Sequence, residues 1–408
     1  MTTPSMSSPG SPSSPSPRLF PSSLSRRSFL KSALAFPAAA TLPGLFARAA
    51  FASGPGDEVL VLVRLEGGND GLNTVVPFAD DLYHRARPGI GVKDPVKLTE
   101  ETGLHPSLGA LRAAWDEGAL AIVQGVGYPD SSRSHFTSTD IWHTAFTGTP
   151  ERWSGWAGRA LDRMDEGEVP ALQLDPAPLS LALTGERVVV PAVADAESFR
   201  VRGNKDLLAA LVARPREGVA EDVRRAGATA YRTAERLEKS LGSGDARGYP
   251  DTDLSRRLWQ VARLVEGGLP ARVYAVRLSG FDTHAKQGNA HALLLRTLGD
   301  ALAAFEADLK AKGLDKRVLV MTYSEFGRRV EENRSLGTDH GTAAPLFVMG
   351  GRVKGGLLGA HPSLADLDEG DLRFHTDFRR VYATVLDRWL KADSHAVLGA
   401  AYAPVPFV

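Results

Sequence analysis

The amino-acid sequence predicts an α/β protein, a three-layer sandwich in which helices cover both faces of a mostly parallel central sheet. Two observations predict this fold class. Short, fully apolar runs are typical of strands that are buried on both faces. Segments with apolar residues at helical spacing alternate with these runs along the chain, which is typical of α/β domains.

Five apolar runs are predicted strands, and each is short and rich in branched side chains. They are residues 58–65, 120–125, 272–278, 317–323 and 345–349. Helices are predicted at residues 111–117, 137–145, 291–309 and 376–390. Residues 204–245 are rich in charged side chains, and we interpret them as a solvated helical flank or a small cap.

The first 52 residues carry the parts of an export signal. Residues 1–24 are rich in Ser and Pro, a composition typical of disorder. Arg26 and Arg27 are followed by Phe-Leu-Lys, by a weakly apolar stretch at residues 32–46 and by small residues suited to cleavage. This pattern is typical of a twin-arginine signal, so we expect the twin-arginine translocase to export the folded protein to the periplasm or beyond.

The apolar stretch of this signal is shorter than the roughly 20 residues of a membrane span. We therefore expect residues 53–408 to form the mature α/β domain, without a stable membrane span after cleavage. An uncleaved anchor or a disordered basic tail is the alternative interpretation of the N-terminus.

Composition excludes several classes of function. The chain of 408 residues has no cysteine, so disulfides, thiolate chemistry and a cysteine nucleophile are excluded. Its 48 basic and 48 acidic residues give a formal charge of zero. Nothing in this balance indicates nucleic acid or an anionic membrane surface as a partner.

Polar and ionisable residues cluster where the predicted strands end. They are Asp70 after the first strand, Ser134 and His135 after the second, Asp282 and His284 after the third, Glu325 after the fourth, and Asp339 with His340 before the fifth. Ligands of open α/β sheets bind beyond the carboxyl ends of the strands, so we expect an active site there. Asp and neutral His together favour zinc or manganese, as one or two divalent ions. Asp282 and His284 are two residues apart, so in an extended chain both side chains can reach one ion.

Each of these motifs also has a structural interpretation. Ser132 or Ser134 can be a helix N-cap, although a serine at a helix start beside a metal can also act as a nucleophile. An Asp-His pair can be a hydrogen-bonded pair in a loop, and residues 67–71 can be a tight turn. Glu325 and Arg328 can form a structural ion pair.

Five motifs, taken in order, resemble one bacterial family. They are LEGGNDGLNT at residues 65–74, SRSHF at 132–136, FDTH at 281–284, SEFGR at 324–328 and TDHG at 338–341. The set resembles DUF1501, a family exported by the twin-arginine route, which in turn resembles the alkaline phosphatase and sulfatase superfamily. This resemblance implies an alkaline-phosphatase-like fold and a two-metal site that hydrolyses or transfers phosphate or sulfate esters.

The resemblance also implies roles for individual residues. Asp70, Asp339 and His340 match the ligands of one metal ion, and Asp282, His284 and His375 match those of the other. Ser134 matches the nucleophile, with Ser132 and Thr137 as alternatives, and His135, Arg133 and Glu325 complete the expected catalytic set. The expected substrate is a small-molecule or polymeric ester.

Two other functions remain open at this point. One is an exported binding or structural protein that keeps the fold without catalysis. The other is a serine hydrolase that uses Ser134, His340 and an acid, although the G-x-S-x-G elbow of many such enzymes is missing.

Overall fold

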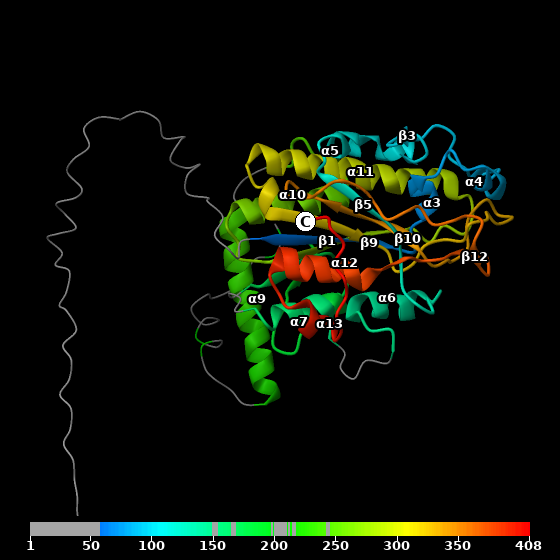
Figure 1. Ribbon diagram of the computed structural model, residues 1–408. Coiled ribbons are helices and arrows are strands. Elements are labelled where there is room, and N and C mark those ends of the chain that lie inside the picture. Colours follow the sequence, from blue (N-terminus) through cyan, green and yellow to red (C-terminus); the bar gives the residue numbers. More distant parts are fainter. Residues whose placement is uncertain are drawn as a thin grey trace, which may run out of the picture. The chain divides into compact units, whose positions relative to one another are not determined.

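The central sheet is built around the first apolar run of the sequence (Figure 1). β1 (Val59–Glu66) pairs in parallel with β8 (Val273–Ser279) on one side and with β9 (Val318–Tyr323) on the other. β10 (Ala344–Met349) is antiparallel both to β9 and to β5 (Leu120–Gly127). All five apolar runs predicted as strands therefore belong to one sheet, and the mostly parallel arrangement is confirmed.

The computed structural model describes residues 58–148, 154–164, 169–196, 199, 210, 213, 218–241 and 245–408. These residues belong to the compact unit Ser53–Val408. The predicted signal in residues 1–52 and much of the first half of the predicted flank lie outside the described residues. In the described part of that flank, α9 (Val219–Leu241) buries Leu237 and Leu241 in a hydrophobic core.

Shorter strands extend the central sheet to nine, in the order β11-β5-β10-β9-β1-β8-β6-β7 with β14 paired to β5. The added strands are β6 (Ala171–Leu174), β7 (Ala192–Val193), β11 (Gly356–Leu358) and β14 (Thr376–Asp377). Two small sheets contain β2 (Val75–Val76), β3 (Val96–Lys97) and β4 (Gly103–Leu104), and β12 (Leu367–Asp368) and β13 (Asp371–Leu372). The sequence did not predict these strands, because two to four residues are too few to show a period.

The side chains of β1 alternate between two hydrophobic cores, as the two-residue period of a strand requires. Val61 and Val63 face one core, and Leu60 and Leu62 face the other. The first core includes residues of α5 (Arg112–Asp116), α10 (Asp253–Glu266) and α11 (Gln287–Ala311). The second includes residues of α6 (His135–Thr144), α7 (Trp156–Leu161), α12 (Phe378–Thr384) and α13 (Ser394–Leu398). Figure 1 shows these two sets of helices on opposite faces of the sheet, which confirms the three-layer sandwich.

Short helical segments complete the described structure. They are α3 (Gly71–Thr74), α4 (Asp81–Ala86), the 3-10 helices η1 (Pro106–Leu111), η2 (Leu181–Leu183) and η3 (Asp315–Arg317), and the π-helix η4 (Val385–Leu390). The helix predicted at residues 376–390 is α12 continued by η4. Within the described ranges, we find no helix that combines the length and apolar character needed to cross a membrane.

The one antiparallel strand of the central sheet decides which loops meet. β1, β5, β8 and β9 run in the same direction and end at the same edge of the sheet. Because β10 runs the opposite way, it begins at that edge. The loop before β10 therefore lies at the same edge as the loops that follow β1, β5, β8 and β9.

His143, on α6, gives the fold a testable dependence on pH. Burial, with a smaller effect of Arg64, lowers the pKa of His143 to about 3, against about 6.5 in an unfolded chain. Between these values the unfolded chain binds a proton that the folded chain does not. The free energy of unfolding therefore falls as the pH is lowered through this window, by at most about 1.4 kcal/mol per pH unit from this group.

We expect His143→Asn to make the melting temperature depend less steeply on pH between about pH 6.5 and 4. Ile141→Ala is the control, because it destabilises the same helix without removing a titratable group. It should lower the melting temperature at every pH and keep the wild-type slope. An unchanged slope in His143→Asn would contradict the buried, neutral imidazole.

Candidate functional site

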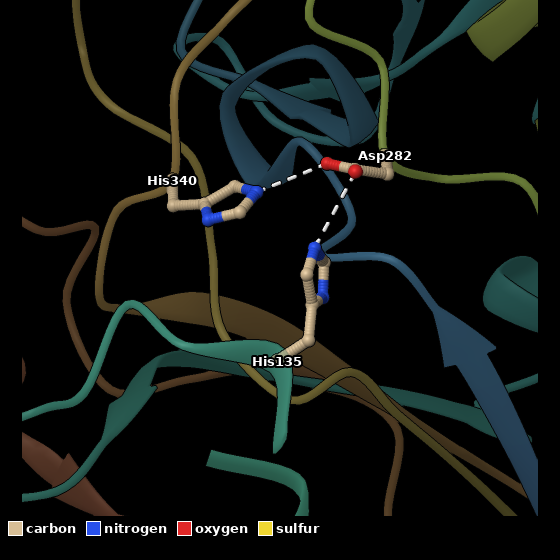
Figure 2. A group of neighbouring side chains, drawn as sticks. All are labelled: His135, Asp282 and His340. Carbon is tan, nitrogen blue, oxygen red and sulfur yellow. Dashed lines mark hydrogen bonds and ion pairs between the residues drawn. The ribbon is translucent and has the colours of Figure 1, made fainter. Parts of the chain in front are cut away.

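Four side chains meet at the loop-bearing edge of the sheet, and we call them the His–Asp cluster: His135, Asp282, His284 and His340. Oδ1 of Asp282 lies 3.0 Å from Nε2 of His284 and 3.0 Å from Nε2 of His340. Its Oδ2 lies 3.4 Å from Nε2 of His135. Figure 2 shows the Asp282 carboxylate between His135 and His340, with one nitrogen of each ring turned toward it. Residues far apart in the sequence therefore present their polar atoms to one point.

The second ring nitrogen of each histidine in the cluster is held by an acceptor. The acceptors are Oε1 of Glu325 for His135 at 2.9 Å, the backbone carbonyl of Arg133 for His340 at 2.8 Å, and Oδ1 of Asp339 for His284 at 3.3 Å. Carboxylates and carbonyls accept hydrogen bonds, so each Nδ1 carries the hydrogen and donates it. Each Nε2 of a neutral imidazole is then left with a free lone pair, as a metal ligand requires.

The three lone pairs and the Asp282 carboxylate converge, and this arrangement requires a positive charge among them. Nε2 of His284 and Nε2 of His340 are only 2.9 Å apart. The ligand atoms of His135, Asp282 and His340 all lie within 4.8 Å of one another. Two atoms bound at about 2.1 Å from one zinc ion lie on the order of 3 Å apart, so the spacing fits a single divalent ion. Protonation of one histidine to imidazolium is the other way to supply the charge.

Asp282 is also held by a buried guanidinium. Nη2 of Arg328, whose side chain is 0% exposed, donates to Oδ1 of Asp282 at 2.7 Å. Burial by itself raises the pKa of Asp282, but the contact with His340 and the hydrogen bond and charge of Arg328 together outweigh burial and hold the pKa well below its ordinary value. The carboxylate is therefore ionised at neutral pH, as a metal ligand must be.

Glu325 is positioned by a different set of contacts from those of Arg328. Its buried carboxylate accepts from Nδ1 of His135 and from the backbone N–H of Gly67, both at 2.9 Å. The interpretation of Glu325 and Arg328 as an ion pair is therefore replaced by two separate contacts, Glu325 with His135 and Arg328 with Asp282. Both residues orient members of the His–Asp cluster.

Asp70, expected as a metal ligand, lies outside the His–Asp cluster. It caps α3 by accepting from the backbone N–H of Asn73, and its buried carboxylate accepts from Arg87 at 2.5 Å and from the amide of Gln287. Burial raises the pKa of Asp70, but Arg87, His291 and Gln287 together outweigh burial and the pKa is lowered. The positive charge beside Asp70 is thus supplied by an arginine of the chain itself.

Two other expected ligands also have different partners. Nδ1 of His375 faces the Thr376 hydroxyl at 3.0 Å, and its Nε2 faces the Ala360 carbonyl at 2.7 Å. Oδ1 of Asp339 accepts hydrogen bonds from Nδ1 of His284 and, at 3.1 Å, from Nδ2 of Asn333. Of the six expected ligands, the structure brings Asp282, His284 and His340 to one point, as one group rather than two.

The segment expected to carry the nucleophile borders the His–Asp cluster. Ser134 is the exposed N-cap residue of α6, and among the described residues its side chain makes no capping hydrogen bond. The Ser132 hydroxyl accepts from the Ser134 backbone N–H at 3.2 Å, and Thr137 is exposed. Arg133 is paired with the buried Asp371, so its charge is already matched. His135, expected in catalysis, is itself a member of the cluster.

A cleft of about 510 Å³ opens beside the His–Asp cluster. His135, Asp282 and Glu325 line it together with Phe136, Thr139 and Asp140 of α6. A larger cavity of about 800 Å³ lies around Arg159 and Arg379, and no cluster member lines it. The smaller cleft is therefore the one that gives a ligand access to the cluster.

The fold and the site define a three-layer α/β protein with a histidine–carboxylate cluster at the loop-bearing edge of its sheet. The chain belongs to DUF1501, a family of proteins of unknown function, whose family model matches residues 96–399. This confirms the family predicted from the five sequence motifs. No match was found among curated proteins.

Solved structures with a similar arrangement were also found, at low identity. A protein of the alkaline phosphatase superfamily from Vibrio parahaemolyticus is 11% identical, over 74% of this chain and 63% of that one, with a TM-score of 0.35. This chain thus spans just under two thirds of that protein. The C-terminal periplasmic domain of EcEptC from Escherichia coli, in complex with zinc, is 10% identical over 72% of this chain and 73% of that one, with a TM-score of 0.31. The PsFucS1 sulfatase from Pseudoalteromonas is 12% identical over 86% and 74%, with a TM-score of 0.37. At these scores the likenesses carry no argument about activity.

The pairing of Asp70 with Arg87 can be tested apart from the His–Asp cluster. Arg87→Met leaves a buried carboxylate without its counter-charge, so we expect a loss of about 3–5 kcal/mol in the free energy of unfolding. Denaturant unfolding of chelator-treated protein measures it. Arg112→Met is the matched control, because it breaks the exposed pair with Asp116 and should cost at most about 1 kcal/mol.

Asp70→Asn should retain any metal bound by the wild type. Loss of that metal with little loss of stability would show that Asp70 is a ligand after all.

Proposed function

We propose that this protein is a metal-dependent hydrolase or transferase of phosphate or sulfate esters, with one divalent ion held by the His–Asp cluster. The observation that carries the proposal is the convergence of three Nε2 lone pairs on the Asp282 carboxylate, with each Nδ1 tied to an acceptor. His135, Asp282, His284 and His340 would hold the ion. Imidazole and carboxylate together suit zinc or manganese.

When bound, such an ion supplies a Lewis acid that polarises an ester oxygen and lowers the pKa of a hydroxyl or a water molecule. The chain's own residues would do the rest. The cleft beside His135 and Asp282 admits the ester. Ser134 presents an exposed hydroxyl at the start of α6, where backbone N–H groups favour the negative charge of the transferred group. Glu325 and Asp339 keep His135 and His284 in the tautomer that leaves Nε2 free.

A non-catalytic binding protein is the second candidate, and one observation favours it. Asp70, which would complete a second metal site, is already paired with Arg87. A site that has kept one ion and lost the other can bind an ester without turning it over.

Metal content tests the proposal directly. We expect protein purified as the full chain to contain about one divalent ion per molecule by elemental mass spectrometry. Asp282→Asn and His340→Ala should lose it, because each removes a converging ligand atom. His375→Ala is the matched control and should retain the ion, since the contacts of His375 lie elsewhere. A wild-type protein without metal, whose melting temperature does not respond to a chelator, would favour the imidazolium arrangement and sink the proposal.

Turnover separates the remaining alternatives. We expect release of nitrophenol from 4-nitrophenyl phosphate or 4-nitrophenyl sulfate, lowered at least about 100-fold in Asp282→Asn. Bound metal without turnover of any ester in a broad panel would favour the non-catalytic protein. Turnover that survives complete removal of the metal would favour the serine hydrolase.

We also propose that the chain is exported by the twin-arginine translocase to the periplasm or the exterior. The support is the Arg26-Arg27 pair with the weakly apolar stretch and small residues after it. Lysine at both positions keeps the charge but should leave the uncleaved chain in the cytoplasm, as cell fractionation would show. Arg18→Lys is the control. Normal export of the double variant would contradict the proposal.

A further inference from the structure

The face of α6 beside the His–Asp cluster presents an aromatic ring next to a carboxylate. Phe136 and Asp140 are four residues apart on this helix, so they lie on the same side of it. Both line the cleft of about 510 Å³ that His135 and Asp282 also line. Phe136 is 87% exposed, more than any other exposed large hydrophobic side chain of the described residues. A ring this exposed, at the entrance to a candidate site, is placed to contact a ligand.

Asp140 differs from the other carboxylates of the cleft in having no cationic partner. Glu66 pairs with Arg277 at 2.6 Å, Asp282 pairs with Arg328 at 2.7 Å, and Glu325 lies 3.9 Å from Nη2 of Arg64. Within the described part of the chain, no ion pair is formed by Asp140, and burial raises its pKa with no opposing charge. A cation arriving from the cleft would therefore be favourable beside this carboxylate.

We propose that Phe136 and Asp140 form a subsite for an alkylammonium group. The face of an aromatic ring attracts a cation through its quadrupole, and a neighbouring carboxylate adds charge attraction. On the proposed function, on which this step rests, the ester handled at the His–Asp cluster carries an ammonium group on the part that occupies the cleft. The subsite itself needs no metal.

The rest of the cleft favours a cation over the alternatives. Nη2 of Arg64 donates to the Thr139 hydroxyl at 3.0 Å, and lies 3.5 Å from Glu66 and 3.9 Å from Glu325. Nη2 of Arg64 is therefore shared among acceptors and its Nε is buried, so this side chain offers little to a further anion. A sugar ring could stack on Phe136, but it would leave the charge of Asp140 unopposed.

Choline and its uncharged isostere, 3,3-dimethylbutan-1-ol, test the subsite, because the two molecules have the same shape but only choline carries a positive charge. We expect the chelator-treated full chain, in low salt, to bind choline at least about tenfold more tightly than the isostere, as measured by NMR titration. Phe136→Ala and Asp140→Asn should each weaken choline binding at least about fivefold. Both positions are at the surface of the cleft, so the melting temperature should stay close to that of the wild type.

Two control variants remove the same kinds of side chain at positions outside the cleft. Leu293→Ala removes an exposed apolar side chain, and Asp251→Asn removes an exposed carboxylate. Both should bind choline as the wild type does. Four results would each overturn the subsite. The protein could bind choline and the isostere equally, or bind neither of them. It could bind methyl glucoside more tightly than choline, or Asp140→Asn could bind choline as tightly as the wild type does. Because no metal is present, a protein that binds choline in this way but never holds an ion would remove the proposed function and leave the subsite standing.

Discussion

The buried guanidinium of Arg328 is the interaction on which the candidate site depends. It donates to the backbone carbonyls of Gly67, Gly68, Phe281 and Thr338 and to the carboxylate of Asp282. A guanidinium taken out of water has to place its five N–H groups on acceptors, and these acceptors come from three separate loops. One side chain thus fixes the loops after β1 and β8 and the loop before β10 relative to one another. The ligand atoms of the His–Asp cluster converge because their backbones are held at this common point.

Glycines make this convergence sterically possible. Gly67 has φ +120°, and a Cβ there would overlap the backbone of Asp282; at Gly68 a Cβ would overlap the ring of Phe326. Gly337 lies in the same way against the backbone of His284. The glycine-rich motif of the sequence therefore serves loop-to-loop packing around Arg328.

The sequence was sufficient to predict the five main strands of the sheet and the edge at which the candidate site lies. Long apolar runs and the polar residues after them are local signals. The sequence did not predict that β10 is antiparallel to its neighbours, because the residues of a strand do not indicate its direction in the sheet. It also could not reveal that Asp70 meets Arg87 or that Arg328 meets Asp282. Such pairs join segments whose approach is decided by the whole fold, and no spacing rule connects them. The helix predicted to begin at residue 137 begins at His135. The contact of His135 with Asp282 joins residues far apart in the sequence, so it forms only once the sheet has assembled.

The two acidic residues that the family resemblance treats as equivalent ligands end in opposite electrostatic settings. Asp282 accepts from Arg328 through Oδ1 yet remains half-exposed, with both oxygens turned toward imidazoles that carry free lone pairs. Asp70 is fully buried, and arginine, glutamine and backbone donors already satisfy its oxygens. A second ion at Asp70 would have to displace the guanidinium of Arg87, which cannot shed its proton and whose side chain is fully buried. If the His–Asp cluster holds metal as proposed, the fold therefore favours one ion over two.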